Sequence, residues 1–158
     1  MKKKILIVLG SGGHTAQILK LLKLLGNRYE YEYVMNDNDV VSGKKIKGKI
    51  YSIPNPRVYE DNFFQKTFKL THGFFQALSI LRKSRPSTII SAGPGLTFPL
   101  FIAAKLLNIK TIYLESWCHV NMKSLSGRLC YPLSDLFFVQ WPELKKQYPK
   151  AIYVGRLG

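Results

Sequence analysis

Glycine, serine and histidine residues follow the first apolar stretch of the chain, in the segment Gly10-Ser-Gly-Gly-His-Thr15. Glycines let the backbone turn sharply and leave its N–H groups uncovered by a Cβ atom. A helix that begins here adds the N–H donors and the positive dipole end of its first turn. This combination suits a phosphate or another anion, although a tight turn without a ligand has the same composition. The predicted anion-binding residues are Gly10, Ser11, Gly12, Gly13 and Thr15.

Two titratable side chains are candidates for catalysis. His14 occupies the position where a helix N-terminus would meet a bound phosphate, so it could donate to an anionic oxygen or act as a base. A capping or packing role is the alternative for this residue. Glu115 is the only acid between Asp61 and Asp135, and it could bind a sugar hydroxyl or accept a proton. No second carboxylate is paired with it, which argues against a hydrolytic acid–base couple.

The elements that must position these residues follow from the apolar pattern. Five consecutive apolar residues, 5–9, predict a buried parallel strand. Apolar residues at steps of three and four from His14 to Leu25 then predict a helix. The same alternation continues along the chain, with strands predicted at 29–35, 49–53, 88–92, 110–115, 136–140 and 151–154, and helices at 62–85, 98–107 and 124–133. This order predicts one α/β domain over residues 1–158, with a doubly wound, mostly parallel, Rossmann-like sheet.

In such sheets, ligands bind beyond the carboxyl ends of the strands. Four polar or glycine-containing clusters fall at that edge: 10–14, 93–95, 115–116 and 140–141. Each cluster alone could be a turn, a cap or part of the core, whereas the four together favour a ligand crevice. The edge therefore adds five residues to the predicted site: Gly93, Pro94, Gly95, Ser116 and Gln140.

The composition indicates an anionic partner. Twenty-four basic and nine acidic residues give a net charge of +15, and residues 1–29 and 62–114 contain no acid. Nucleic acid, an anionic lipid surface and a pyrophosphate substrate all fit this charge. Cys118 and Cys130 lack zinc-like spacing, so no metal site is predicted. No secretory signal and no run of 18 apolar residues is found, so we expect a cytoplasmic protein without a membrane span.

The predicted helix 62–85 carries a broad aromatic stripe that includes Phe64, Phe68 and Phe75, and all of its charges are positive. Such a stripe usually packs on a sheet. Aromatic residues beside basic ones are also typical of a helix that lies on an anionic membrane surface. Opposite sides of one helix could serve both purposes.

Several short motifs occur in order along nearly the whole chain, and together they resemble the asparagine-linked glycosylation protein fourteen family and its prokaryotic polysaccharide-synthesis counterparts. The motifs are Gly10-Ser-Gly-Gly-His-Thr15, Ser91-Ala-Gly-Pro-Gly95, Tyr113-Leu-Glu-Ser116, Ser124-Leu-Ser-Gly127, Gln140-Trp-Pro-Glu143 and Tyr148-Pro149. The resemblance implies a fold like the N-terminal half of a GT-B glycosyltransferase. It also implies that Gly12, Gly13 and His14 lie near the pyrophosphate of a lipid-linked acceptor, with 93–95 and 115–116 lining the same cleft.

The expected function is therefore that of the acceptor-binding, membrane-associated subunit of a two-component UDP-sugar glycosyltransferase, acting on UDP-N-acetylglucosamine or a related hexose. The resemblance implies that a separate small subunit holds the UDP-sugar donor, so this chain needs no cofactor and is inactive alone. Its other partners are a polyprenyl-pyrophosphate-linked sugar and the cytoplasmic face of an anionic membrane, to which it attaches peripherally. A small dinucleotide-binding protein and a basic nucleic-acid-binding module are the alternatives. Thr15 replaces the last glycine of the dinucleotide motif, and no recognised nucleic-acid motif is present.

Overall fold

The computed structural model describes residues 2–43, 46–53 and 63–157. Within these ranges the strands form a seven-stranded sheet in the order β3-β2-β1-β4-β5-β6-β7. Every neighbouring pair is parallel. The chain therefore builds the sheet outward in one direction from β1 to β3 and then in the other direction from β4 to β7.

The elements alternate along the chain as the sequence predicts. The strands are β1 (Lys4–Val8), β2 (Glu30–Asn36), β3 (Lys49–Ile53), β4 (Thr88–Ser91), β5 (Lys110–Leu114), β6 (Leu136–Val139) and β7 (Ile152–Tyr153). The α-helices are α1 (Gly13–Leu25), α2 (Val40–Gly43), α3 (Phe63–Ser84), α4 (Thr97–Leu106) and α5 (Leu125–Cys130). Three 3₁₀ turns are η1 (Gly26–Arg28), η2 (Tyr131–Leu133) and η3 (Pro142–Lys146).

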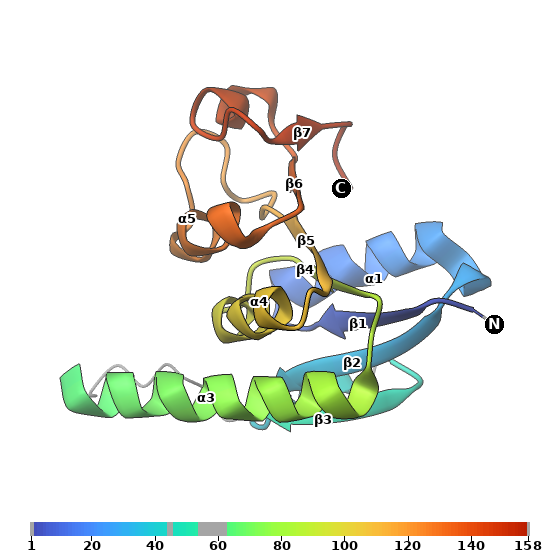
Figure 1. Ribbon diagram of the computed structural model, residues 1–158. Helices are drawn as coiled ribbons and strands as arrows, with labels where there is room; N and C mark the ends of the chain where they lie inside the picture. Colours follow the sequence, from blue (N-terminus) through green and yellow to red (C-terminus); the bar gives the residue numbers. More distant parts are fainter. Residues whose placement is uncertain (1, 44–45, 54–62, 158) are drawn as a thin grey trace.

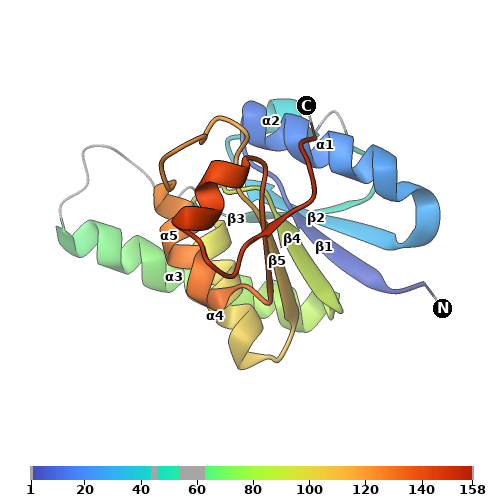
Figure 2. The ribbon, with the colours of Figure 1, turned by 90° about the horizontal axis from the view of Figure 1, so that it is seen from above.

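Helices cover both faces of the sheet. Helices α1 and α2 lie on one face, and α3, α4 and α5 lie on the other (Figures 1 and 2). Successive residues of a strand point to opposite faces. Accordingly, Leu6 and Val8 of β1 pack in the cluster under α3 and α4, whereas Ile5 and Ile7 pack in the cluster under α1. The apolar run of β1 is thus buried on both sides, as expected for a central parallel strand.

The predicted fold class is confirmed, and the predicted element boundaries agree with the observed ones to within a few residues. The short helix α2 and the turns η1 and η3 were not predicted, because segments of three to five residues are too short to show apolar periodicity. The single helix expected at 124–133 is instead α5 followed by the 3₁₀ turn η2. Pro132, which lacks a backbone N–H donor, stands inside that turn.

Helix α3 extends well past the sheet on the side toward which the β1 arrow points (Figure 1). Phe74 and Leu78 pack against the core, whereas Phe75 is 65% exposed. The aromatic stripe of α3 is therefore partly buried in the core along the C-terminal part of the helix. The side chains of Phe64 and Phe68 lie outside the described residues, so their prediction stays open. No helix within the described ranges has both the length and the apolar character needed to cross a membrane.

Candidate functional site

Two loops meet where the sheet changes its direction of growth, between β1 and β4. Gly10 follows β1 and Pro94 follows β4, and a Cβ atom built on Gly10 would lie 2.8 Å from the Cβ of Pro94. This contact is too close for any side chain, so the approach of the two loops requires glycine at this position. A switch point of this kind is where open α/β sheets bind ligands. The residues predicted at 10–14, 93–95, 115–116 and 140–141 all follow neighbouring strands, and we call this edge the strand-end rim.

The carbonyl oxygen of Gly10 is held by two buried hydroxyl groups. The Thr15 hydroxyl donates to this oxygen, and the Ser42 hydroxyl donates to it over 3.2 Å. Thr15 is only 2% exposed, so its hydroxyl shapes the loop from below. In this arrangement Thr15 supports the loop, and its predicted contact with an anion stays a prediction. Ser42 belongs to α2, whose first turn is capped by Asp39 through a 3.1 Å bond from the Ser42 amide.

His14 links the two loops. Its Nδ1 atom lies 2.6 Å from the carbonyl oxygen of Ala92. A carbonyl oxygen only accepts hydrogen bonds, so this nitrogen must carry the proton. The neutral ring then has its acceptor lone pair at Nε2. Gly93 adopts a φ of +98°, and a Cβ atom there would lie 3.4 Å from the His14 ring and 2.9 Å from the Tyr113 hydroxyl. The loop after β4 therefore fixes the orientation of the imidazole.

The outer part of the first loop is open to solvent. Ser11, Gly12 and Gly13 are exposed, and Gly12 has a φ of +59°, which L side chains adopt with strain. No side chain caps the start of α1, so N–H groups of its first turn lack helical partners, as at any helix N-terminus. These donors lie at the exposed start of α1, next to His14 in the chain. Their contact with an anion stays a prediction.

The Glu115 side chain is fully buried at the end of β5. Its carboxylate accepts hydrogen bonds from the Ser116 amide at 2.9 Å, from the Ser124 hydroxyl at 2.8 and 3.0 Å, and from the Tyr148 hydroxyl at 3.0 Å. Burial, together with the Glu115 charge, raises the pKa of Tyr148 above its ordinary value, so the phenol stays a donor. This arrangement argues against the direct catalytic contact predicted for Glu115.

Gln140 and Ser116 belong to a buried amide network. The Gln140 side chain donates to the Gln17 side chain over 2.6 Å and to the Glu115 carbonyl oxygen over 2.9 Å. Its own oxygen accepts from the Leu157 amide at 3.0 Å. Gln17 in turn donates to the Ser116 hydroxyl over 3.3 Å. Gln140 is 1% exposed, so this network places Gln140 and Ser116 under the rim, where they join distant segments and do not face the ligand side.

Trp117 and Trp141 form a pair beside the rim that the sequence did not predict. The Trp141 indole donates to the carbonyl oxygen of Trp117 over 2.7 Å, and the Trp117 indole nitrogen would lie 3.9 Å from a Cβ atom on Gly13. The Lys20 ammonium stands 5.0 Å from the centre of the Trp117 ring, and the Arg156 guanidinium 4.4 Å from that of Trp141. Each ring of the tryptophan pair thus carries a cation, and positive charge near the rim favours an anionic ligand.

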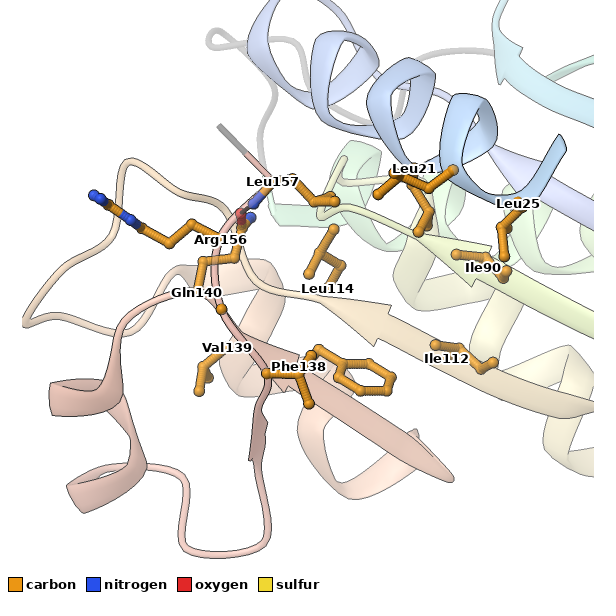
Figure 3. Close-up of a pocket in the computed structure, with 13 residues that line it drawn as sticks. Leu21, Leu25, Ile90, Ile112, Leu114, Phe138, Val139, Gln140, Arg156 and Leu157 are labelled. Carbon is orange, nitrogen blue, oxygen red and sulfur yellow. Dashed lines mark hydrogen bonds between the residues drawn. The ribbon is translucent and has the colours of Figure 1, made fainter.

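An apolar cavity of about 420 Å³ lies on the α1 face of the sheet, between α1 and the strands β4, β5 and β6. Leu21 and Leu25 of α1 point toward Ile112 and Phe138 of the sheet across it, and the segment 154–157 closes one end (Figure 3).

Within the described residues, no group of three or more His, Cys, Asp or Glu side chains is placed to hold a metal ion.

Comparison with known proteins gives a match over almost the whole chain. The model of a family described as "Oligosaccharide biosynthesis protein Alg14 like" matches residues 5–157. The human UDP-N-acetylglucosamine transferase subunit ALG14 is 36% identical, over 97% of this chain and 82% of the human protein. The protein of the same name from Yarrowia lipolytica is 33% identical, over 98% of this chain and 81% of its own.

Solved structures share the fold at low sequence identity. MurG from Acinetobacter baumannii superposes with a TM-score of 0.77 and 17% identity, over 98% of this chain. A UDP-GlcNAc 2-epimerase from Methanocaldococcus jannaschii gives a TM-score of 0.71 and 14% identity, over 97% of this chain. The chain spans about 45% of the length of each of these proteins. It therefore has the fold of one Rossmann-like half of a GT-B protein.

Proposed function

The chain belongs to the Alg14 family of oligosaccharide biosynthesis proteins, and on this premise we propose that it is the acceptor-binding subunit of a two-component UDP-sugar glycosyltransferase. The relatives that it matches are named as subunits of a UDP-N-acetylglucosamine transferase. The proposed substrate on this chain is a sugar linked to a polyprenyl pyrophosphate. The proposed partner is a small donor-binding subunit that carries the UDP-sugar.

The observation that carries this proposal is the exposed, uncapped start of α1 at the switch point between β1 and β4. Gly12 and Gly13 are exposed, and no side chain caps the first turn of α1, so its N–H groups are available to a ligand. Lys20 and Arg156 add positive charge on the rings of Trp117 and Trp141. A pyrophosphate carries anionic oxygens that accept several such hydrogen bonds at once, and charge-assisted bonds of this kind are the strong ones.

His14 is the proposed base. Because Nδ1 donates to Ala92, the neutral ring offers Nε2 as the acceptor for a proton. In the transfer step, a hydroxyl oxygen of the acceptor sugar forms a bond to the anomeric carbon of the donor while its proton passes to Nε2. The bond from that carbon to the nucleotide oxygen breaks, and UDP leaves with the electron pair. Removing a base of this type lowers the rate by about 10²–10⁴-fold.

The donor and the acceptor must be held together, since positioning supplies much of the rate in such a reaction. We propose that the donor-binding subunit docks on the strand-end rim and completes the cleft there. Trp117 and Trp141 are both partly exposed beside the rim. Together with the exposed glycine loop, they provide a surface with apolar and polar parts for this contact. The isolated chain is then expected to be silent in transfer assays.

We further propose that the protein attaches peripherally to an anionic membrane, which presents the lipid-linked acceptor. The net charge of +15 supports this, as does the projection of α3 past the sheet on the side of the strand-end rim (Figures 1 and 2). Phe75 on that helix is exposed, whereas Arg82 and Lys83 are exposed at the other end of the helix, where Lys4 at the start of β1 donates to the Ser84 carbonyl. Apolar contact and attraction to anionic lipid add together at such surfaces.

The test combines calorimetry with a transfer assay. The purified chain is titrated with UDP-N-acetylglucosamine, and transfer to a polyprenyl-pyrophosphate-linked sugar is measured with and without a donor-binding subunit. We expect no measurable donor binding by the chain alone and turnover only in the complex. Micromolar donor binding and steady turnover by the isolated chain would refute the division of labour. Tight binding of a nicotinamide dinucleotide would instead support the alternative.

A further inference from the structure

We propose that Glu115 is a positioning residue whose buried carboxylate ties together both ends of the loop 116–124 and so holds Trp117 beside the glycine loop. This inference rests on the proposed function only where it concerns acceptor binding. Its structural part, the placement of the loop by one carboxylate, concerns this chain alone. The residue acts through the loop and does not contact the substrate.

The hydrogen bonds of the carboxylate reach both ends of the loop. The Oε1 atom accepts from the Ser116 amide at 2.9 Å, at the start of the loop, and from the Ser124 hydroxyl at 2.8 Å, at its end. The Oε2 atom accepts from the Ser124 hydroxyl at 3.0 Å and from the Tyr148 hydroxyl at 3.0 Å. One side chain therefore closes a loop of nine residues and also fastens it to the segment that follows η3.

The surroundings of the carboxylate are tightly packed. Ser124 caps α5 by accepting from the Gly127 amide at 2.8 Å, and a Cβ atom on Gly127 would overlap the Glu115 carboxylate and lie 2.6 Å from the Tyr148 hydroxyl. Tyr148 is itself fully buried, with its ring 4.6 Å from that of Phe137. The carboxylate is thus enclosed by fixed donors, and losing an acceptor for any of them is costly in a buried site.

The loop that is held in this way lies at the strand-end rim. Its first residue, Ser116, accepts a hydrogen bond from Gln17 of α1 at 3.3 Å, and the carbonyl of Trp117 accepts one from Trp141. The Trp117 indole lies next to Gly13. Because a buried carboxylate sets both ends of the loop, a change at Glu115 displaces Trp117 and with it one wall of the proposed acceptor site.

The chain provides a built-in probe of this displacement, because Trp117 and Trp141 are its only two tryptophans and both lie at this loop. The test uses Glu115→Gln, which keeps the size of the side chain but replaces one of the two acceptor oxygens with a donor. Ser124→Ala is the second variant, because it removes only the hydroxyl at the far end of the loop. The matched control is Asp135→Asn: this carboxylate also accepts from a strand residue, the Thr111 amide at 2.7 Å, but at the opposite end of β5.

Acrylamide quenching of tryptophan fluorescence is measured on each folded variant, with far-UV circular dichroism as the check on folding. In the complex with the donor-binding subunit, KM for the acceptor, KM for UDP-sugar and kcat are then determined. We expect steeper quenching and a red-shifted emission for Glu115→Gln and Ser124→Ala. We also expect a rise in acceptor KM of roughly tenfold, with donor KM unchanged, since misplaced binding groups cost about this much or more. Asp135→Asn should match the wild type in all of these readouts.

Quenching and emission equal to the wild type in both Glu115→Gln and Ser124→Ala would overturn the inference, whatever the activity. An acceptor KM that stays unchanged while quenching increases would overturn the link between the loop and acceptor binding. A wild-type complex without transferase activity would instead refute the proposed function, and altered quenching in the same variants would still support placement of the loop by Glu115.

Discussion

Replacing Gly13 with alanine separates the binding function of the glycine loop from its folding. A Cβ atom at this position would meet only the Trp117 indole nitrogen, at 3.9 Å, which is an ordinary van der Waals distance. Its φ is not in the left-handed region, so the variant pays no conformational cost. Alanine is a better helix former than glycine and narrows the unfolded ensemble, so we expect the free energy of unfolding to stay equal or rise by about 0.4–1 kcal/mol.

Acceptor binding should respond in the opposite direction. The new methyl group stands over the N–H donors at the start of α1, and it keeps a pyrophosphate oxygen from approaching at least one of them. A hydrogen bond to a charged group contributes about 1.5–3 kcal/mol, so losing one weakens acceptor binding roughly ten- to a hundredfold. Gly13→Val, with two more methyl groups, should abolish detectable transfer.

The assay is steady-state transfer by the reconstituted complex, with chemical denaturation of the isolated variant beside it. Gly12→Ala is the matched comparison for stability. Gly12 has a φ of +59°, and no atom lies within 4 Å of a Cβ built there. Alanine at this position should therefore destabilise the fold by about 1–3 kcal/mol through backbone strain alone. If Gly13→Ala keeps the wild-type acceptor KM, the pyrophosphate does not bind at this loop and the reasoning is refuted.

Three further predictions concern other parts of the chain. His14→Ala should lower kcat by about 10²–10⁴-fold in the complex while leaving subunit association intact, and full activity in this variant would remove the base from the mechanism. Flotation of the protein with anionic vesicles should be weakened by salt and by Phe75→Ser. Phe74→Ser is the control, because it destabilises the core. Flotation that does not depend on salt would contradict a contribution from charge. Partial burial alone would raise the pKa of Asp135, but hydrogen bonds from Lys105 and a neighbouring threonine hold it below the ordinary value of 3.8. The stability from this group is therefore fully present above pH 3.8 and lost as the pH falls through the lower folded-state pKa. Asp135→Asn should lower the free energy of unfolding by about 0.5–1 kcal/mol at neutral pH and should weaken its decrease at acid pH. An unchanged decrease at acid pH would contradict the role given to Asp135.

The order of the elements could be predicted because each one has a local signal. Strands β1, β4 and β6 are short apolar runs that end at glycine or a polar residue, and α1 repeats apolar residues every three to four positions. These patterns depend on neighbours in the sequence and need no knowledge of the fold. The position of the rim followed from the same information, since the carboxyl ends of parallel strands share one edge.

The internal bonding of the site could not be predicted in the same way, because it depends on residues far apart in the sequence. Gln17 and Gln140 are separated by 123 positions, and their contact exists only once α1 and β6 have packed on the sheet. One signal was available: Gln17 stands one turn before Leu21, within the apolar stripe of α1. A polar residue in such a stripe indicates a buried hydrogen-bond partner. The burial of Glu115 had no comparable signal, since an acid after a strand is equally consistent with a rim or a core position.

The distribution of buried and exposed groups explains how an incomplete site can be ready for a partner. Among the groups expected to touch the ligand, Gly12 and Gly13 are exposed and His14 is partly exposed. The groups that hold them are buried: the hydroxyls on the Gly10 carbonyl, the Ala92 carbonyl under His14 and the Glu115 carboxylate. Donors that are already oriented need no reorganisation when charge arrives, and this is where electrostatic catalysis gains most. Under the proposed function, docking of a donor-binding subunit would then have only to exclude water and supply the sugar. It follows that substitutions in the buried supports should lower activity in the complex even though none of them touches the acceptor.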